Sequence, residues 1–143
     1  MQDQTLLCTF RVGPMKLGID VHEVQEVIRE QQMTRVPGSH DLVRGLMNLR
    51  GRIVTALDLS KRLGIPEDPN HRALTNVVVR TNENPVSLLV HEIGDVVTVT
   101  SDSFEPPPET LLGVPRELIR GAWKLKDGLL LGLNTQAVLQ IAA

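Results

Sequence analysis

Alternating apolar and polar residues predict β-strands along most of this chain. The first strand runs from Leu6 to Val12 and alternates between two faces. The predicted buried face holds Leu6, Cys8, Phe10 and Val12, and the other face holds Leu7, Thr9 and Arg11. Turn residues follow it and recur down the chain, as expected for a fold of many short strands. We therefore expect a mainly β protein built from small barrels. Further strands are predicted over 15–20, 75–81, 86–90, 93–100, 117–124 and 129–133.

Short helices are predicted where a capping residue precedes apolar residues at helical spacing. Asp20 with Glu23 resembles a capping box, and Val21, Val24 and Ile28 follow at that spacing, although these β-branched residues also suit a strand. Three further helical segments are predicted: one turn over 40–44 ended by Gly45, a helix over 58–63 capped by Asp58 and ended by Gly64, and a terminal helix that is capped by Asn134 and includes Ile141.

A hairpin at the centre of the chain is the most distinctive local pattern. Two apolar runs, 46–49 and 53–57, flank Arg50-Gly51-Arg52, and Gly51 permits the positive φ of a tight turn. We expect Leu49 and Ile53 to be anchored in the core while the Arg50 side chain projects outward. A turn arginine is either a solvated residue or a recognition residue, and the pattern alone leaves both open.

Composition excludes several classes of function. The chain of 143 residues fits one domain, its net charge is −2, and it has one Trp, two Phe and no Tyr, which argues against a nucleic-acid partner. Its four histidines are far apart, and it has neither a phosphate loop nor a serine elbow. We therefore expect no metal, no cofactor and no enzymatic activity.

The chain also lacks signals for export or membrane insertion. Its start is polar and acidic, and eighteen apolar residues never occur in a row. The lone Cys8 is expected to be a buried thiol rather than a nucleophile. Residues 101–115 hold four of the nine prolines and are expected to form a stiff surface loop, and we find no repeat at a fixed period. A cytoplasmic protein is expected.

Several short motifs, taken together, resemble those of the CheW-type coupling proteins of bacterial chemotaxis. The resemblance runs from about Leu6 to Ile141, and the Asn-Leu-Arg-Gly hairpin is its most specific part. In chain order the motifs are Phe10-Arg11-Val12, Leu17-Gly18-Ile19-Asp20, Val24-Gln25-Glu26-Val27, Val36-Pro37, Val43-Arg44-Gly45, Asn48-Leu49-Arg50-Gly51 and Leu57-Asp58-Leu59.

This resemblance implies a fold and a set of partners. The fold would be two packed five-stranded SH3-like barrels, forming one domain over residues 1–143 from two intertwined subdomains. The implied function is that of a non-catalytic adaptor. It would couple the cytoplasmic tip of a chemoreceptor to the regulatory domain of a CheA-type histidine kinase, at receptor arrays on the inner face of the membrane. Ring assembly with the kinase is also implied.

The resemblance further implies which residues bind these partners. Arg50 offers a planar fork for a carboxylate, either that of Glu26 or one on a partner. A receptor tip would present apolar residues that a shallow groove rich in valine can cover. The residues implied to line or support the binding groove are Val24, Glu26, Val27, Gly45, Arg50 and Val90.

Two positions depart from the family pattern. The family usually has proline where Thr55 stands and aspartate where His91 stands. These departures leave the identity of the partners open. Two alternatives remain: a small β-barrel protein that binds a small molecule, and an adaptor of a chemosensory system that does not control flagella.

Overall fold

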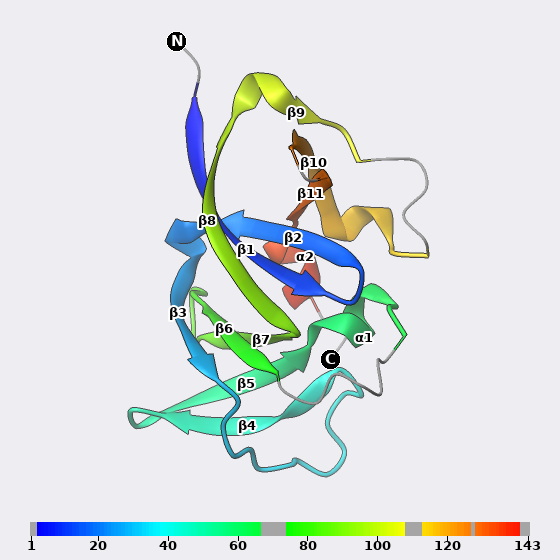
Figure 1. Cartoon of the computed structure of the whole chain (residues 1–143). Coiled ribbons are helices and arrows are strands. Elements are labelled where there is room, and N and C mark those ends of the chain that lie inside the picture. Colours follow the sequence, from blue (N-terminus) through cyan, green and yellow to red (C-terminus); the bar gives the residue numbers. More distant parts are fainter. Residues whose placement is uncertain (1–2, 67–73, 108–112, 127, 141–143) are drawn as a thin grey trace.

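Two β-sheets form this protein, as the computed structural model shows for residues 3–66, 74–107, 113–126 and 128–140 (Figure 1). The first sheet has the strand order β8-β1-β2-β11-β10-β9 and the second the order β3-β6-β7-β5-β4. The strands of the first sheet are β1 (Gln4–Val12), β2 (Met15–Asp20), β8 (Glu92–Thr100), β9 (Phe104–Glu105), β10 (Ile119–Leu125) and β11 (Gly128–Leu133). The strands of the second sheet are β3 (Val24–Arg29), β4 (Val43–Leu49), β5 (Arg52–Asp58), β6 (Thr75–Val79) and β7 (Val86–Val90).

The helices of the described residues are short and lie at strand ends. They are α1 (Leu59–Leu63), α2 (Thr135–Leu139) and the 3-10 turns η1 (Val21–Glu23), η2 (Ser101–Ser103) and η3 (Arg116–Leu118). As predicted, Asp58 caps α1 by accepting from the Lys61 N–H, and Gly64 ends it with a φ of 74°. Asn134 caps α2 in the same way, through the Ala137 N–H. The prediction of a mainly β protein with few, short helices is confirmed.

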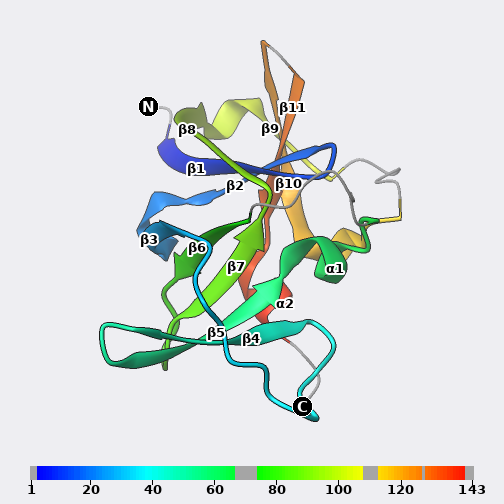
Figure 2. The same ribbon diagram turned by 60° about the horizontal axis from the view of Figure 1, so that its bottom comes forward.

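The chain starts in the first sheet, builds the whole second sheet, and then returns with β8. Each sheet combines antiparallel neighbours with one parallel pair, β2 with β11 and β5 with β7. Each sheet is also closed by the continuation of one edge strand onto the other edge. In the second sheet Thr34, beyond β3, exchanges hydrogen bonds of 2.7 and 2.8 Å with Leu46 of β4, and in the first sheet β9, beyond β8, pairs with β10. The two closures give each sheet a barrel-like form (Figures 1 and 2).

Three apolar clusters hold this arrangement together. The largest lies between the sheets and includes Phe10 and Leu17 from the first and Leu57 and Leu88 from the second, each no more than 2% exposed. Smaller clusters fill the individual sheets. Leu7, Val99, Trp123 and Leu130 form the one in the first sheet, and Met47, Val54 and Val78 form the one in the second. Because strand neighbours point to opposite faces, Val77 joins the large cluster and Val78 the small one.

This layering explains why the prediction for the first strand was wrong in detail. Leu6 was placed on the buried face, but it is 48% exposed, whereas Leu7 and Thr9, assigned to the other face, are buried. β1 lies in the middle of a sheet with apolar clusters on both faces, so its burial pattern does not alternate. Cys8 is buried as predicted, and burial raises the pKa of its thiol.

Two predicted helical segments are not helical. The expected helix after Asp20 is limited to η1, and residues from Val24 onward form β3, which pairs with β6. The β-branched residues suited both structures, and strand pairing with a distant segment decided between them. The turn predicted over 40–44 is not a helix either, and Gly45 lies inside β4.

Some predictions concern residues that the structure leaves undescribed. They include the centre of the proline-rich loop, Asp127 in the last hairpin and Ile141 in the terminal helix. The division of residues 1–143 into one domain with two intertwined barrel subdomains stays a prediction.

Candidate functional site

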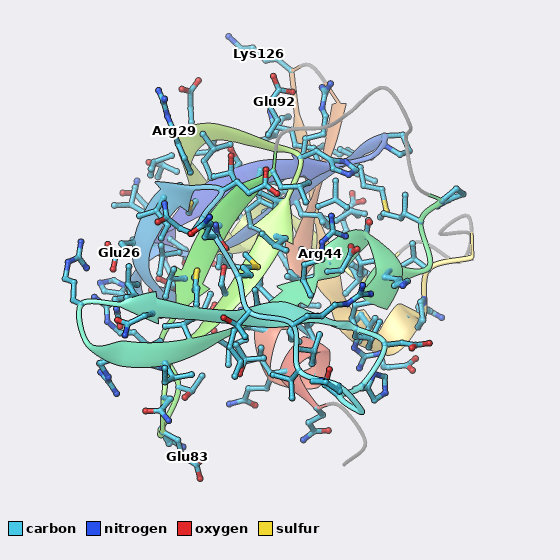
Figure 3. The ribbon with its side chains drawn as sticks, turned by 90° about the horizontal axis from the view of Figure 1, so that it is seen from below. Glu26, Arg29, Arg44, Glu83, Glu92 and Lys126 are labelled. Atoms are coloured by element: carbon cyan, nitrogen blue, oxygen red, sulfur yellow. The ribbon has the colours of Figure 1, made fainter. Side chains whose placement is uncertain are left out.

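The central hairpin, β4 and β5, places Arg50 against strand β3. The Arg50 Nη1 atom lies 2.5 Å from the Glu26 Oε1 atom. The Arg50 side chain is 72% exposed and the Glu26 side chain 17% exposed. In Figures 1 and 2 the hairpin extends beyond the rest of its sheet, and in Figure 3 the Glu26 label marks β3 beside the hairpin tip. The sequence left two carboxylate partners open for Arg50, and the structure shows Glu26 as one.

The turn that carries Arg50 has a well-defined geometry. Arg50 and Gly51 are the two loop residues, with φ angles of 53° and 85°. Positive φ at both positions is the signature of the two-residue turn that matches the twist of paired strands. The Asn48 side chain supports the turn, because its Oδ1 accepts from the Gly51 N–H at 2.9 Å. The backbone under Arg50 is therefore fixed while the guanidinium remains exposed.

The two charged groups stabilise each other's ionised forms. The hydrogen bond from Arg50, and then its positive charge, lowers the pKa of Glu26 below its usual range. The hydrogen bond to Glu26 raises the pKa of Arg50. At neutral pH the site therefore presents an arginine that is oriented by an ionised carboxylate and still has free donors.

Apolar side chains on the same elements are only partly covered. Val27, next to Glu26, is 39% exposed, and Ile53, on β5 just beyond the turn, is 52% exposed. The expectation that Ile53 would be anchored in the core was wrong, and Leu49 is half-buried. The hairpin tip reaches past the core of its own sheet, so Ile53 has no layer of residues to cover it.

Val24 begins β3 and is half-buried against the large cluster. A register shift between Val24 and Glu26 changes which side chains of β3 face outward. Arg80 holds this irregular point, because its guanidinium donates to the carbonyl oxygens of His22 at 2.9 Å and Val24 at 2.6 Å. Sequence reasoning did not single out Arg80, and its place beside the turn after a valine run carries no signal of this contact.

Gly45 and Val90 do not reach the surface. Val90 is fully buried in the large cluster. A Cβ at Gly45 would lie 3.0 Å from the Met33 Cβ and 3.0 Å from the Thr34 oxygen, so Gly45 permits the close approach that closes the second sheet. Of the six predicted residues, Glu26, Val27 and Arg50 present accessible atoms on adjoining elements. Val24 is half-buried, and Gly45 and Val90 are buried.

The two departures from the family pattern have structural explanations. Thr55 lies in β5 between β4 and β7, paired with Leu46 and Val86, a position where a backbone N–H donor is useful. The His91 ring accepts a hydrogen bond at Nδ1 from the Gly13 N–H, at 2.7 Å. An aspartate could accept the same bond, so the change at His91 preserves a contact between the end of β7 and the β1–β2 turn.

The described residues contain no group of three or more metal-ligating side chains. They also contain no helix long and apolar enough to cross a membrane. What the site offers chemically is a fixed cation beside partly exposed apolar side chains, which is typical of a surface that binds another protein.

Comparisons with known proteins agree with this picture. The model of the CheW-like domain family matches residues 6–143. The "Probable chemotaxis protein CheW" of Rhizobium etli is 33% identical over 116 residues, which cover 80% of this chain and 74% of that protein. The "Chemotaxis protein CheW" of Klebsiella aerogenes is 29% identical over 133 residues, covering 91% of this chain and 78% of that one.

A solved structure confirms the expected fold. The scaffolding protein TtCheW from Thermoanaerobacter tengcongensis superimposes with a TM-score of 0.87 at 23% identity, over 97% of this chain and 90% of that chain. At this identity the likeness is one of fold. With the family model matching almost all of the sequence, the chain belongs to the CheW-like family.

Proposed function

We propose that this protein is a non-catalytic adaptor that couples the cytoplasmic tip of a chemoreceptor to the regulatory domain of a CheA-type histidine kinase. The observation that carries the proposal is the pair of Glu26 and Arg50, which holds an exposed guanidinium beside Val27 and Ile53. Family membership supports the same function. The protein would act in the cytoplasm at receptor arrays, without inserting into the membrane, and ring assembly with the kinase remains part of the proposal.

The surface suits a helical partner. A receptor tip presents apolar side chains at helical spacing, and Val27 with Ile53 offers apolar area at the edge of the second sheet. Arg50 can bind a carboxylate of the partner with the donors that Glu26 leaves free. Because the turn is rigid, little conformational entropy of the backbone is lost on binding. Val24, Gly45 and Val90 support this surface from beneath.

The test is a binding titration with purified kinase regulatory domain and receptor fragment, using Arg50→Ala and Arg50→Lys. Loss of the charged fork should weaken binding to at least one partner by about 10- to 100-fold. Lysine should restore little, because an ammonium cannot reproduce a bidentate contact. Arg29→Ala is the matched control, since Arg29 is an exposed arginine on β3, the strand that carries Glu26 (Figure 3). Unchanged binding of Arg50→Ala to both partners would contradict the assignment of this surface.

A further inference from the structure

A small cavity in the first sheet lies away from the surface around Arg50. It has an open volume of about 210 Å³, and its walls include Thr5, Val99, Ser101, Phe104, Arg120 and Trp123. The lining therefore combines apolar and aromatic side chains with hydroxyl groups and a guanidinium. Such a mixture, in a volume below the range of drug-sized ligands, suits a small molecule with one polar end.

Trp123, one of the residues that line this cavity, has an unsatisfied donor. The residue is 8% exposed, and its Nε1–H has no hydrogen-bond partner among the described residues. The far edge of its six-membered ring lies over Gly132, where a Cβ would be 2.8 Å from Cζ3, so Nε1 is on the opposite edge. Buried donors in folded proteins are nearly always paired with protein, water or ligand.

Arg120 is an exposed arginine that lines the cavity, and Arg44 in the same chain provides a comparison. Arg44 occupies the corresponding place in the β4–β5 hairpin, where its Nη1 is 3.4 Å from the Asp58 carboxylate. The counterpart of Asp58 is Asn134, an amide that caps α2. Arg120 therefore lacks the carboxylate that Arg44 has, and it makes no hydrogen bond or ion pair with the described residues.

Asp20 is the nearest competing anion. Arg120 contributes to lowering the pKa of Asp20 by its charge. The Asp20 Oδ1 atom, however, already accepts from the His22 N–H at 2.9 Å and lies 2.8 Å from the His22 ring. Asp20 therefore interacts with the charge of Arg120, but it forms no hydrogen bond with the Arg120 guanidinium.

We propose that this cavity binds a small carboxylate that carries a flat apolar body, such as an aromatic acid. The carboxylate pairs with Arg120 and accepts from the Trp123 N–H, and the apolar body packs on Val99. The indole nitrogen is shielded from solvent, so the ligand reaches it by displacing the Phe104 ring. That ring is 39% exposed and its centroid is 4.9 Å from that of Trp123, and on ligand binding it would turn outward.

Because Trp123 is the one tryptophan of the chain, its fluorescence reports on this cavity alone. The experiment is a titration of the full-length protein with benzoate at constant ionic strength, with acetate and benzyl alcohol as partial ligands. We expect saturable quenching or a shift of emission with benzoate, and at least about tenfold weaker binding of either partial ligand. Absence of a saturable change with benzoate, or equal binding of either partial ligand, would overturn the proposal.

Substitutions at Arg120 and Trp123 test whether these residues contact the ligand. Arg120→Gln should weaken benzoate binding about tenfold or more, whereas Arg29→Gln, which removes the same charge from the other sheet, should leave it unchanged. Trp123→Phe keeps an aromatic wall without the N–H and should weaken binding several-fold, measured by calorimetry. If Arg120→Gln does not fold, Arg120→Lys keeps the charge and should still bind less tightly. Wild-type affinity in a folded variant at Arg120 would contradict the assignment.

Discussion

The two long hairpins of this protein, β4–β5 and β10–β11, have the same backbone arrangement but different residues at their turns, which we call the tips. Each opens with an apolar residue, Arg and Gly, has a register shift at that point, and turns through a two-residue loop. Each then leads into a capped helix of five residues. The opening residues are Val43-Arg44-Gly45 in one hairpin and Ile119-Arg120-Gly121 in the other.

The correspondence extends to whole sheets, although no fixed period is visible in the sequence. In each sheet, one strand of the long hairpin pairs in parallel with a strand of another hairpin. These pairs are β5 with β7 in the second sheet and β11 with β2 in the first. In the second sheet that other hairpin follows α1, whereas in the first it is supplied by the start of the chain. The elements therefore occur in a permuted order, which hides the repeat from a search along the sequence.

The tips differ in their charge pairing. Arg50 is paired with Glu26, whereas Lys126, in the corresponding loop, is exposed and has no ion pair within the described part of the chain. Figure 3 shows Lys126 far from Glu26, at another side of the molecule. A hairpin of the same plan therefore forms without such a pair. The comparison indicates that the pair of Glu26 and Arg50 orients the exposed Arg50 guanidinium and is not required to build the hairpin.

The largest loss of stability is expected when a Cβ is added at Gly121 or Gly45, the glycines at which the backbone of each hairpin is approached closely by another segment. A Cβ at Gly121 would lie 2.1 Å from the Phe104 Cζ and 2.5 Å from the Glu105 oxygen, so Gly121→Ala must displace β9. At Gly45 the nearest atoms are 3.0 Å away. We expect Gly121→Ala to lower the free energy of unfolding by about 3 kcal/mol and Gly45→Ala by about 1 kcal/mol. Urea denaturation measures both, and equal losses would contradict the difference between the two closures.

The two helix caps should differ by a smaller amount. Asp58 accepts from the Lys61 N–H and the Ser60 hydroxyl and lies 3.4 Å from Arg44, whereas Asn134 has one cap bond and a long contact to the Glu117 oxygen. We expect Asp58→Ala to cost about 2 kcal/mol and Asn134→Ala about 1 kcal/mol. Asp58→Asn serves as a control that keeps the cap acceptor and removes the charge. A larger loss from Asn134→Ala than from Asp58→Ala would reverse the comparison.

These details mark what the sequence can predict. The caps at Asp58 and Asn134 and the turn at Gly51 were predicted, because each depends on residues a few positions apart. For the segment of β3 the sequence predicted a short helix and left a strand open, because its pairing with β6 is decided by residues about fifty positions away, which local spacing does not contain. Leu6 and Ile53 were placed in the core for the same reason, since burial depends on which layer lies above a strand.

The candidate site was predictable in part. Glu26 and Arg50 were identified from the resemblance, and their contact joins β3 to a turn that only the closed sheet brings close. The burial of Gly45 and Val90 beneath the surface, and the support by Arg80, follow from the folded arrangement alone. The binding roles of all six predicted residues remain predictions.

The pH dependence of stability should separate the two tips. Because the pKa of Glu26 is lowered in the folded protein, its pairing stabilises the fold at pH values above the unfolded pKa, about 4.3. This contribution is lost as the pH falls through the lower, folded pKa. We expect Glu26→Gln to lower the unfolding midpoint by about 2 °C at pH 7 and by nothing at strongly acid pH. Asp20 has a lowered pKa in both proteins, so its effect cancels in the difference.

The smallest expected effect is the most informative about Arg50. Arg50→Ala removes the ion pair but leaves a residue at a φ of 53°, whereas Arg50→Asn removes the ion pair and tolerates that angle. Lys126→Ala is the matched change at the other tip. We expect all three variants to unfold within about 2 °C of the wild type, with Asn at or above Ala, because the β10–β11 hairpin forms without a corresponding pair. Thermal unfolding followed by circular dichroism measures this. A loss of about 5 °C or more in both Arg50 variants, absent in Lys126→Ala, would make the pair a structural requirement of its own hairpin.

Binding to the partner should separate the Arg50 variants from the wild type even though their stability does not. Both Arg50 variants should lose affinity although they remain folded, because under the proposed function the missing fork, and not the turn, contacts the partner.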